Sequence, residues 1–150
     1  MKYFLAGIMQ GNLQTGMVSQ DYRKELAELI KSLDKEADIH DPLNVCEHPD
    51  KLEKIDEIRE VFEYNVKKAG EADIVIAYIP IASMGTGLEM LEAYKAGKTV
   101  FTISPLKTNW TVRLYSTQIF ETMKDFTEFF KTKFIDGIYV DSVKSSSTPQ

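Results

Sequence analysis

The sequence predicts an α/β domain in which a mostly parallel, five-stranded sheet carries helices on both faces. Residues 73–79 and 98–104 are almost uninterrupted apolar runs, which is typical of parallel strands buried on both faces. Segments with apolar residues at helical spacing precede and separate these runs, so strands and helices alternate along the chain. The 150 residues, 43% of them hydrophobic, are enough for one domain, which we place at residues 1–141.

The first third of the chain is predicted to form a strand, a loop, a helix and a second strand. Residues 2–8 are a short apolar run, and the glycine-containing residues 11–20 follow as a loop. Apolar residues then recur at helical spacing, which predicts a helix from Ser19, as its N-cap, to Lys35. Residues 37–40 predict a short second strand.

The next helix contains one polar residue in an otherwise apolar stripe. It is predicted to begin near Lys51, after the aperiodic, proline-containing residues 41–50. Its stripe should face the sheet and consists of Ile55, Ile58, Phe62, Asn65 and Ala69. Asn65 therefore needs a hydrogen-bond partner, because buried amides are rarely unpaired.

The second half of the chain alternates in the same way. A helix over residues 86–96 separates the two buried strands and closes at Gly97. Residues 109–120 predict a helix that leads into a short edge strand. Late phenylalanines recur at helical spacing and mark the buried face of a last helix, which consists of Phe126, Phe129, Phe130 and Phe134. Residues 142–150 are polar and serine-rich, and we expect them to be disordered. The whole pattern is doubly wound, of the flavodoxin-like or Rossmann-like kind.

Three loops of such a sheet should lie at the same edge. Ligands of doubly wound sheets bind beyond the carboxyl ends of the strands. The loops that follow the expected strands are residues 8–17, 80–87 and 104–110. We therefore expect the functional site among them.

Charge and composition limit the classes of partner. The formal net charge is −5 and the basic residues form no stripe, which argues against a nucleic-acid polymer. No stretch approaches the roughly 18 apolar residues of a membrane helix, and residues 1–11 become polar before a signal-peptide core develops. With a single cysteine, Cys46, we expect a cytoplasmic protein without a membrane partner.

Several familiar motifs fit poorly. Residues 85–90 begin like a dinucleotide-binding GxGxxG but end in Met and follow the third expected strand. The letters GKT at residues 97–99 lack the first glycine of a phosphate-binding loop and enter a strand. His40, Cys46 and His48 do not have zinc-site spacing. We expect neither a metal nor a cofactor.

The segment SMGTGLE, residues 83–89, supports two interpretations. Thr86 as N-cap and Glu89 three residues later match a capping box, which would be purely structural. Alternatively, Glu89 is a carboxylate at a helix N-terminus, held ionised by the helix dipole and by backbone amides, and it serves as a nucleophile. Ser83 and free amides of the same loop would then contact an anionic or hydroxyl-rich ligand.

Residues 72–98 resemble the core of the nucleoside 2-deoxyribosyltransferase-like superfamily, which includes the 2′-deoxynucleoside 5′-monophosphate N-hydrolases. The resemblance lies in a strand that starts with Ala-Asp and is followed by Ser-x-Gly-x-x-x-Glu, here Ser83, Gly85 and Glu89. The opening YFLAGIMQG resembles the family's first strand and substrate loop. The resemblance implies cleavage of an N-glycosidic bond in a nucleoside or nucleotide.

The resemblance also assigns roles to individual residues. It implies that Glu89 is the nucleophile, that Tyr3 lies near the sugar and the nucleophile, and that Ser83 and Gly85 contact the substrate. The implied first-loop contacts are Gly7, Ile8, Met9 and Gly11. An ordinary strand aromatic and a turn serine are the structural alternatives for Tyr3 and Ser83.

Two positions depart from the family pattern. Asn65 stands where the family usually has an aspartate that orients substrate or assists proton transfer, and an amide exchanges no proton at neutral pH. The first loop has Ile8-Met9-Gln10 where the hydrolases carry an arginine, which argues against a preference for a monophosphate.

The resemblance implies further substrate contacts and a dimer. His40, at the end of the second expected strand, would protonate the base, or else is a surface or capping histidine. Asn109 and Trp110 fall in a loop that the family sends into a neighbouring subunit's pocket, so a homodimer or higher homo-oligomer is implied. Trp110 would stack on a base or pack in the interface.

Other activities stay open. Gly85-Thr86-x-x-Glu89 also resembles the GTxxE motif of the lysine-decarboxylase-like phosphoribohydrolases, although Ser83-Met84 replaces their preceding glycine pair. A nucleotide-binding module without catalysis is the alternative from another class, with Glu89 as a helix cap. A purely structural domain would leave the glycines around the carboxylate without a reason.

Overall fold

The computed structural model describes residues 1–135, with side chains described up to Lys133. The expected disordered residues 142–150 and the end of the expected domain lie outside the described residues. The strands are β1 Lys2–Gly7, β2 Asp38–His40, β3 Ile74–Tyr78, β4 Thr99–Ile103 and β5 Gln118–Phe120. The α-helices are α1 Asp21–Leu33, α2 Ile55–Glu71, α3 Met84–Lys95, α4 Trp110–Tyr115 and α5 Met123–Ile135. Two short 3-10 helices, η1 Pro42–Asn44 and η2 Pro49–Lys51, follow β2.

The five strands form one parallel sheet in the order β2-β1-β3-β4-β5. This confirms the predicted doubly wound α/β fold, and the order is that of flavodoxin-like sheets. After β1 the chain adds β2 at one edge of β1, and it then crosses over to add β3 at the opposite edge of β1. The switch point, where ligands bind in such sheets, therefore lies between β1 and β3.

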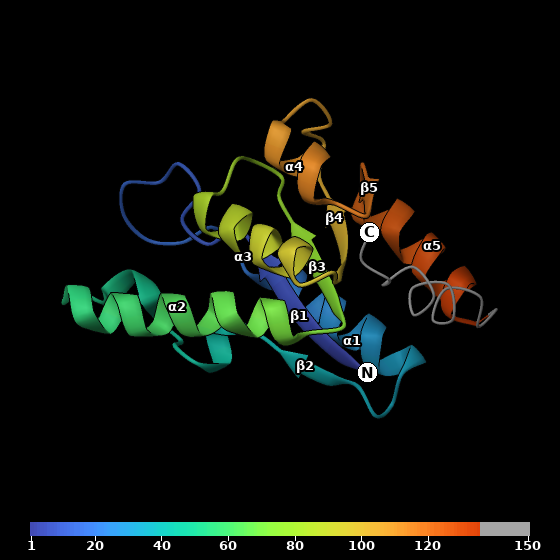
Figure 1. Ribbon diagram of the computed structural model, residues 1–150, viewed down its shortest axis with the longest axis horizontal. Helices are drawn as coiled ribbons and strands as arrows, with labels where there is room; N and C mark the ends of the chain where they lie inside the picture. Colours follow the sequence, from blue (N-terminus) through green and yellow to red (C-terminus); the bar gives the residue numbers. More distant parts are fainter. Residues whose placement is uncertain (136–150) are drawn as a thin grey trace.

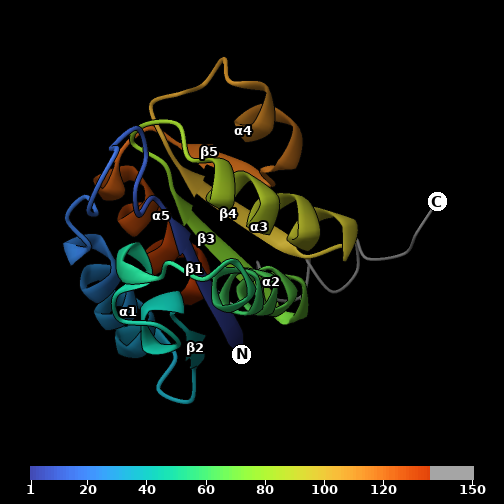
Figure 2. The ribbon, with the colours of Figure 1, turned by 90° about the vertical axis from the view of Figure 1, so that its left-hand side faces the viewer.

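Two helical layers cover the sheet (Figures 1 and 2). Side chains alternate between the faces of each strand, so Tyr3 and Leu5 of β1 pack with α1 and α5, whereas Phe4 and Ala6 pack with α2 and α3. Of the late phenylalanines predicted to be core, Phe126, Phe129 and Phe130 belong to the first layer, and the Phe134 side chain lies outside the described residues. Phe126 and Phe130 are buried there in ring contact with each other.

The start of α2 differs from the expectation. Residues 49–51 form a 3-10 turn, so the α-helix begins at Ile55. The stripe predicted to face the sheet does so only in its second half: Asn65 and Ala69 are buried, whereas Ile55, Ile58 and Phe62 are 66%, 37% and 40% exposed. The reason is length, since the first half of α2 extends past the ends of the strands (Figure 1).

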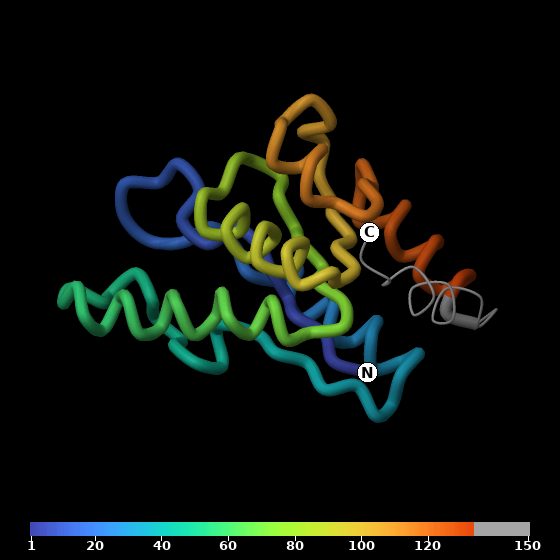
Figure 3. The backbone as a smooth tube through the Cα atoms, in the orientation of Figure 1, coloured from blue at the N-terminus to red at the C-terminus, as the bar shows by residue number. Residues whose placement is uncertain are grey.

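The first helix starts slightly later than predicted. The N-cap of α1 is Gln20, and Ser19 instead donates its hydroxyl to the Asp21 carboxylate at 2.8 Å. The loop after β1 projects from the molecule at the same end as the starts of α2 and α3 (Figure 3). Two of the three loops expected at the site, residues 8–17 and 80–87, thus lie at the same end. Among the described residues no helix has the length and apolar character needed to cross a membrane.

Candidate functional site

A cavity of about 350 Å³ lies beyond the carboxyl ends of β1, β2 and β3, within the size range of small-molecule sites. It is lined by the loop after β1, the segment after β2, one side of α2 and the start of α3. Its wall comprises Gly7, Met9, Gln10, Gly11, Pro42, Cys46, Pro49, Asp50, Leu52, Ile58, Val61, Phe62, Asn65, Ser83, Met84, Gly85, Thr86, Leu88 and Glu89. The loop after β4, which was expected here, is replaced by the segment after β2.

Glu89 is one of two carboxyl residues in the described cavity wall. It projects from the second turn of α3 and is partly buried. Removal from water raises the pKa of Glu89 to about 8, and the positive charge of Arg23 offsets only part of this rise. The carboxyl group is therefore mostly protonated at neutral pH, which contradicts the expectation that the helix dipole holds it ionised.

The predicted capping box is wrong. The N-cap of α3 is Ser83, so Thr86 is the third helical residue and Glu89 lies beyond the first turn. The Ser83 and Thr86 hydroxyls are hydrogen-bonded to each other at 2.8 Å. Since Glu89 has no capping role, its position in the cavity wall needs another explanation.

Gly7 closes the end of β1 where the cavity begins. A Cβ atom at this position would overlap the Tyr22 hydroxyl and approach the Tyr22 ring carbons to 2.7 Å. The Tyr22 ring cannot retreat freely, because it is 6% exposed, lies 4.4 Å from the Tyr78 ring and donates to Ile8 O at 3.1 Å. Only glycine fits at residue 7.

Gly7→Ala is therefore expected to destabilise the fold by about 1–3 kcal/mol through overpacking. The measurement is the urea midpoint of unfolding. Gly70→Ala is the matched control: its Cβ would meet only the exposed Glu92 side chain, at 3.1 Å, so its midpoint should stay the same or rise. Equal midpoints for wild type and Gly7→Ala would contradict the steric argument.

The other predicted first-loop residues divide between the cavity and the core. Met9 and Gly11 line the cavity. Ile8 is 1% exposed and is not part of the cavity wall; its carbonyl accepts hydrogen bonds from Gln20 and Tyr22. The Ile8 side chain thus belongs to the core, and its carbonyl fixes the start of the loop.

Asn65 and His40, both singled out from the sequence, lie together. The His40 ring nitrogen Nε2 donates to Asn65 Oδ1 at 2.9 Å, and the His40 ring stacks on Phe4 with centroids 5.2 Å apart. The prediction that Asn65 is buried with a partner is confirmed. Asn65 lines the cavity, whereas His40 is absent from its wall. His40 therefore reaches the cavity only through the amide of Asn65.

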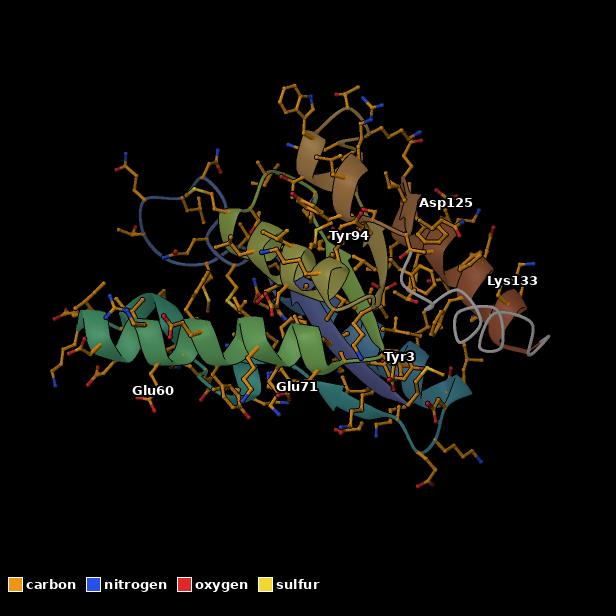
Figure 4. All side chains as sticks on the ribbon, viewed as in Figure 1. Tyr3, Glu60, Glu71, Tyr94, Asp125 and Lys133 are labelled. Atoms are coloured by element: carbon orange, nitrogen blue, oxygen red, sulfur yellow. The ribbon has the colours of Figure 1, made fainter. Side chains whose placement is uncertain are left out.

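Two predicted site residues lie elsewhere. Tyr3 is at the amino end of β1, 1% exposed and in edge contact with Phe130, at the end of the molecule opposite the loop after β1 (Figure 4). Burial, with a smaller contribution from Asp34, raises the pKa of its hydroxyl. Asn109 is the N-cap of α4 and its side chain accepts from Val112 N at 3.3 Å. Neither lines the cavity, and completion of the site by a second copy through Asn109 and Trp110 stays a prediction.

Sequence reasoning missed a buried arginine beneath the site. Arg23 is 3% exposed and donates from Nη1 to Leu5 O and Asp41 at 2.8 and 3.1 Å, and from Nη2 to Gly7 O at 3.3 Å. The signal was present, because Arg23 precedes Leu26 by one helical turn on the apolar face of α1. Arg23 holds the end of β1 that carries Gly7.

Asp50 and Cys46 were also missed as cavity residues. Both belong to the segment after β2, which has no periodic pattern that would indicate the direction of its side chains. Asp50 lies in η2 and Cys46 just after η1. Only the tertiary arrangement brings them opposite α3.

Comparison with solved structures gives three matches over nearly the whole chain. A 2-deoxyribosyltransferase from Bacillus psychrosaccharolyticus has a TM-score of 0.64 at 17% identity, covering 89% of this chain and 96% of its own. A conserved protein from Enterococcus faecalis V583 has a TM-score of 0.59 at 21% identity, covering 89% and 98%. A CMP N-glycosidase from Clostridium botulinum has a TM-score of 0.51 at 18% identity, covering 88% and 99%.

No protein-family model matches the chain, and no curated protein matches it. At identities of 17–21% the structural matches establish the fold. The expected resemblance is confirmed at this level: the chain has a nucleoside 2-deoxyribosyltransferase-like fold.

Proposed function

We propose that this protein cleaves the N-glycosidic bond of a nucleoside or nucleoside 5′-monophosphate with Glu89 as the nucleophile. The observation that carries the proposal is the position of Glu89, a carboxyl group without a capping role in the wall of a cavity at the β1/β3 switch point. The shared fold with a 2-deoxyribosyltransferase and a CMP N-glycosidase supports this reaction class.

The reaction proceeds in two displacements. An ionised Glu89 oxygen attacks C1′ of the sugar, the C1′–N bond breaks, and its electron pair leaves with the base, which takes a proton from water. A glycosyl ester on Glu89 results. Water then attacks C1′, frees the carboxylate and gives the sugar, and a second base in place of water gives base exchange.

Asn65 orients the substrate and transfers no proton. Its carbonyl oxygen is occupied by His40, which leaves its amide nitrogen as the donor toward the cavity that it lines. His40 fixes the direction of this donor. Asn65 therefore positions the substrate at a place where an aspartate could transfer a proton. Water supplies the proton for the departing base.

The proposal predicts that free base is released from a panel of nucleosides and their 5′-monophosphates, as measured by chromatography. Because the nucleophile is the ionised form and the pKa of Glu89 is about 8, kcat/KM should rise with pH and level off above pH 8. If every compound stays intact while binding is still detectable, the chain is a nucleotide-binding module. A pH profile that is already flat at pH 6 would contradict the role of Glu89.

A further inference from the structure

The wall of the cavity carries negative charge and no formal cation. Among its described residues there is no lysine, arginine or histidine, but there are two carboxyl groups, Asp50 and Glu89, and Glu89 adds its negative charge in the ionised form that attacks the sugar. The nearby Arg23 is engaged beneath the floor by Asp41 and by backbone carbonyls. A phosphate dianion in this cavity would meet like charge, which disfavours its binding.

Asp50 presents a buried oxygen without a partner. Its Oδ1 is shielded from solvent and accepts no hydrogen bond from the described residues, while its side chain lines the cavity. A buried carboxylate oxygen is costly unless a donor satisfies it. The part of the Asp50 side chain that lines the cavity can in addition accept a hydrogen bond from a hydroxyl or amino group of a ligand.

Within the described wall, the start of α3 is the feature that favours an anion. The first amides of a helix attract phosphate, but here the Ser83 hydroxyl is already hydrogen-bonded to Thr86. No cation reinforces these amides within the described wall. The balance of charges therefore favours an uncharged ligand.

We propose that the cavity selects an unphosphorylated nucleoside and that Asp50 accepts a hydrogen bond from a hydroxyl or amino group of it. A selectivity measured by turnover rests on the reaction proposed above. A selectivity measured by ligand binding does not depend on that reaction. Asp50 is then a specificity-determining residue that faces Glu89 across the substrate.

The test compares kcat/KM for each common 2′-deoxynucleoside with that for its 5′-monophosphate. The nucleoside should be favoured by about tenfold or more, and Asp50→Asn should lower its kcat/KM by about 10- to 100-fold, as expected when a hydrogen bond to a charged group is lost. For the monophosphate the same lost hydrogen bond is offset by the removal of a like charge, so its kcat/KM should fall by clearly less than that of the nucleoside. Asp56→Asn, at a side chain that is 92% exposed on α2, is the matched control and should leave both values unchanged.

A second variant tests the charge argument without touching Asp50. Met9→Arg places a cation in the wall and should raise kcat/KM for the monophosphate relative to the nucleoside by about tenfold, because like-charge juxtaposition is relieved. Analogues assign the donor: 2′-deoxyinosine lacks the amino group of 2′-deoxyadenosine, and 2′,3′-dideoxyadenosine lacks the 3′-hydroxyl. The analogue that is insensitive to Asp50→Asn identifies the missing group.

A wild-type preference for the monophosphate would overturn the inference and leave the reaction intact. An equal effect of Asp50→Asn on both substrates would also overturn it, since a structural role alone would do this. If no compound is turned over, the proposed reaction fails, and the same pairs are compared by the rise in Tm that each ligand produces. A larger rise with the monophosphate then overturns the inference, and a larger rise with the nucleoside supports it.

Discussion

Glu89→Gln is expected to abolish base release and to make the fold more stable at alkaline pH. Glutamine cannot attack C1′, so kcat should fall by about 10³-fold or more. The pKa of Glu89 is raised from 4.5 to about 8 in the folded protein. The stability that the neutral carboxyl group contributes is thus fully present below pH 4.5 and is lost as pH rises through 8. Glutamine stays neutral and avoids this loss.

The expected gain for Glu89→Gln above pH 8 is about 2–5 kcal/mol, the lower end applying because the side chain is only partly buried. Urea unfolding at pH 5 and pH 9 measures it, and the two proteins should differ only at pH 9. Glu92→Gln makes the same change at an exposed residue of α3 and should alter neither activity nor the pH dependence. A Glu89→Gln variant that retains turnover would exclude Glu89 as the nucleophile.

Arg23→Leu is expected to destabilise the protein by about 3 kcal/mol, because it removes a buried guanidinium from two backbone carbonyls and from Asp41, which is itself 19% exposed. Leu5 O and Gly7 O lose their donor, and Asp41 loses its cation at 3.1 Å. Activity should fall as well, since Gly7 lines the cavity. Urea unfolding at pH 7 measures the change in stability.

Arg59→Leu serves as the comparison for Arg23→Leu. Its side chain is 61% exposed and its ion pairs with Asp56 and Glu63 are both 3.9 Å long, so the variant should differ from wild type by less than about 1 kcal/mol. Arg23→Lys should recover only part of the loss, because an ammonium group cannot reproduce the fork of a guanidinium. A loss below about 1 kcal/mol for Arg23→Leu would show that the buried contacts contribute little.

The periodic spacing of apolar residues was sufficient to predict the layers of the fold. The run at residues 73–79 contains the central strand β3. The stripe on α2 predicted a buried Asn65 with a partner, which is His40. Buried positions recur with the period of the helix or strand that contains them, so the spacing of apolar residues in the sequence predicts them.

The details of the site depended on non-local contacts. SMGTGLE contains two residues suited to cap a helix, Ser83 and Thr86, and only the structure shows that the first of them is the N-cap. Asp50 lies in an aperiodic segment, so no pattern indicated that this residue lines the cavity. Tyr3 was placed by resemblance, and the structure puts it at the opposite end of β1.

The order of the strands along the chain differs from their order in the sheet. β1 is the first strand in the sequence but lies inside the sheet, between β2 and β3. Its start is joined to β3 by a 2.8 Å bond from Lys2 N to the Asp73 carboxylate, across 71 positions. During synthesis β1 must therefore wait, unpaired on this side, until nearly half of the chain has followed. Long-range parallel pairing of this kind is slow and leaves apolar strands open to aggregation until their partners have been made.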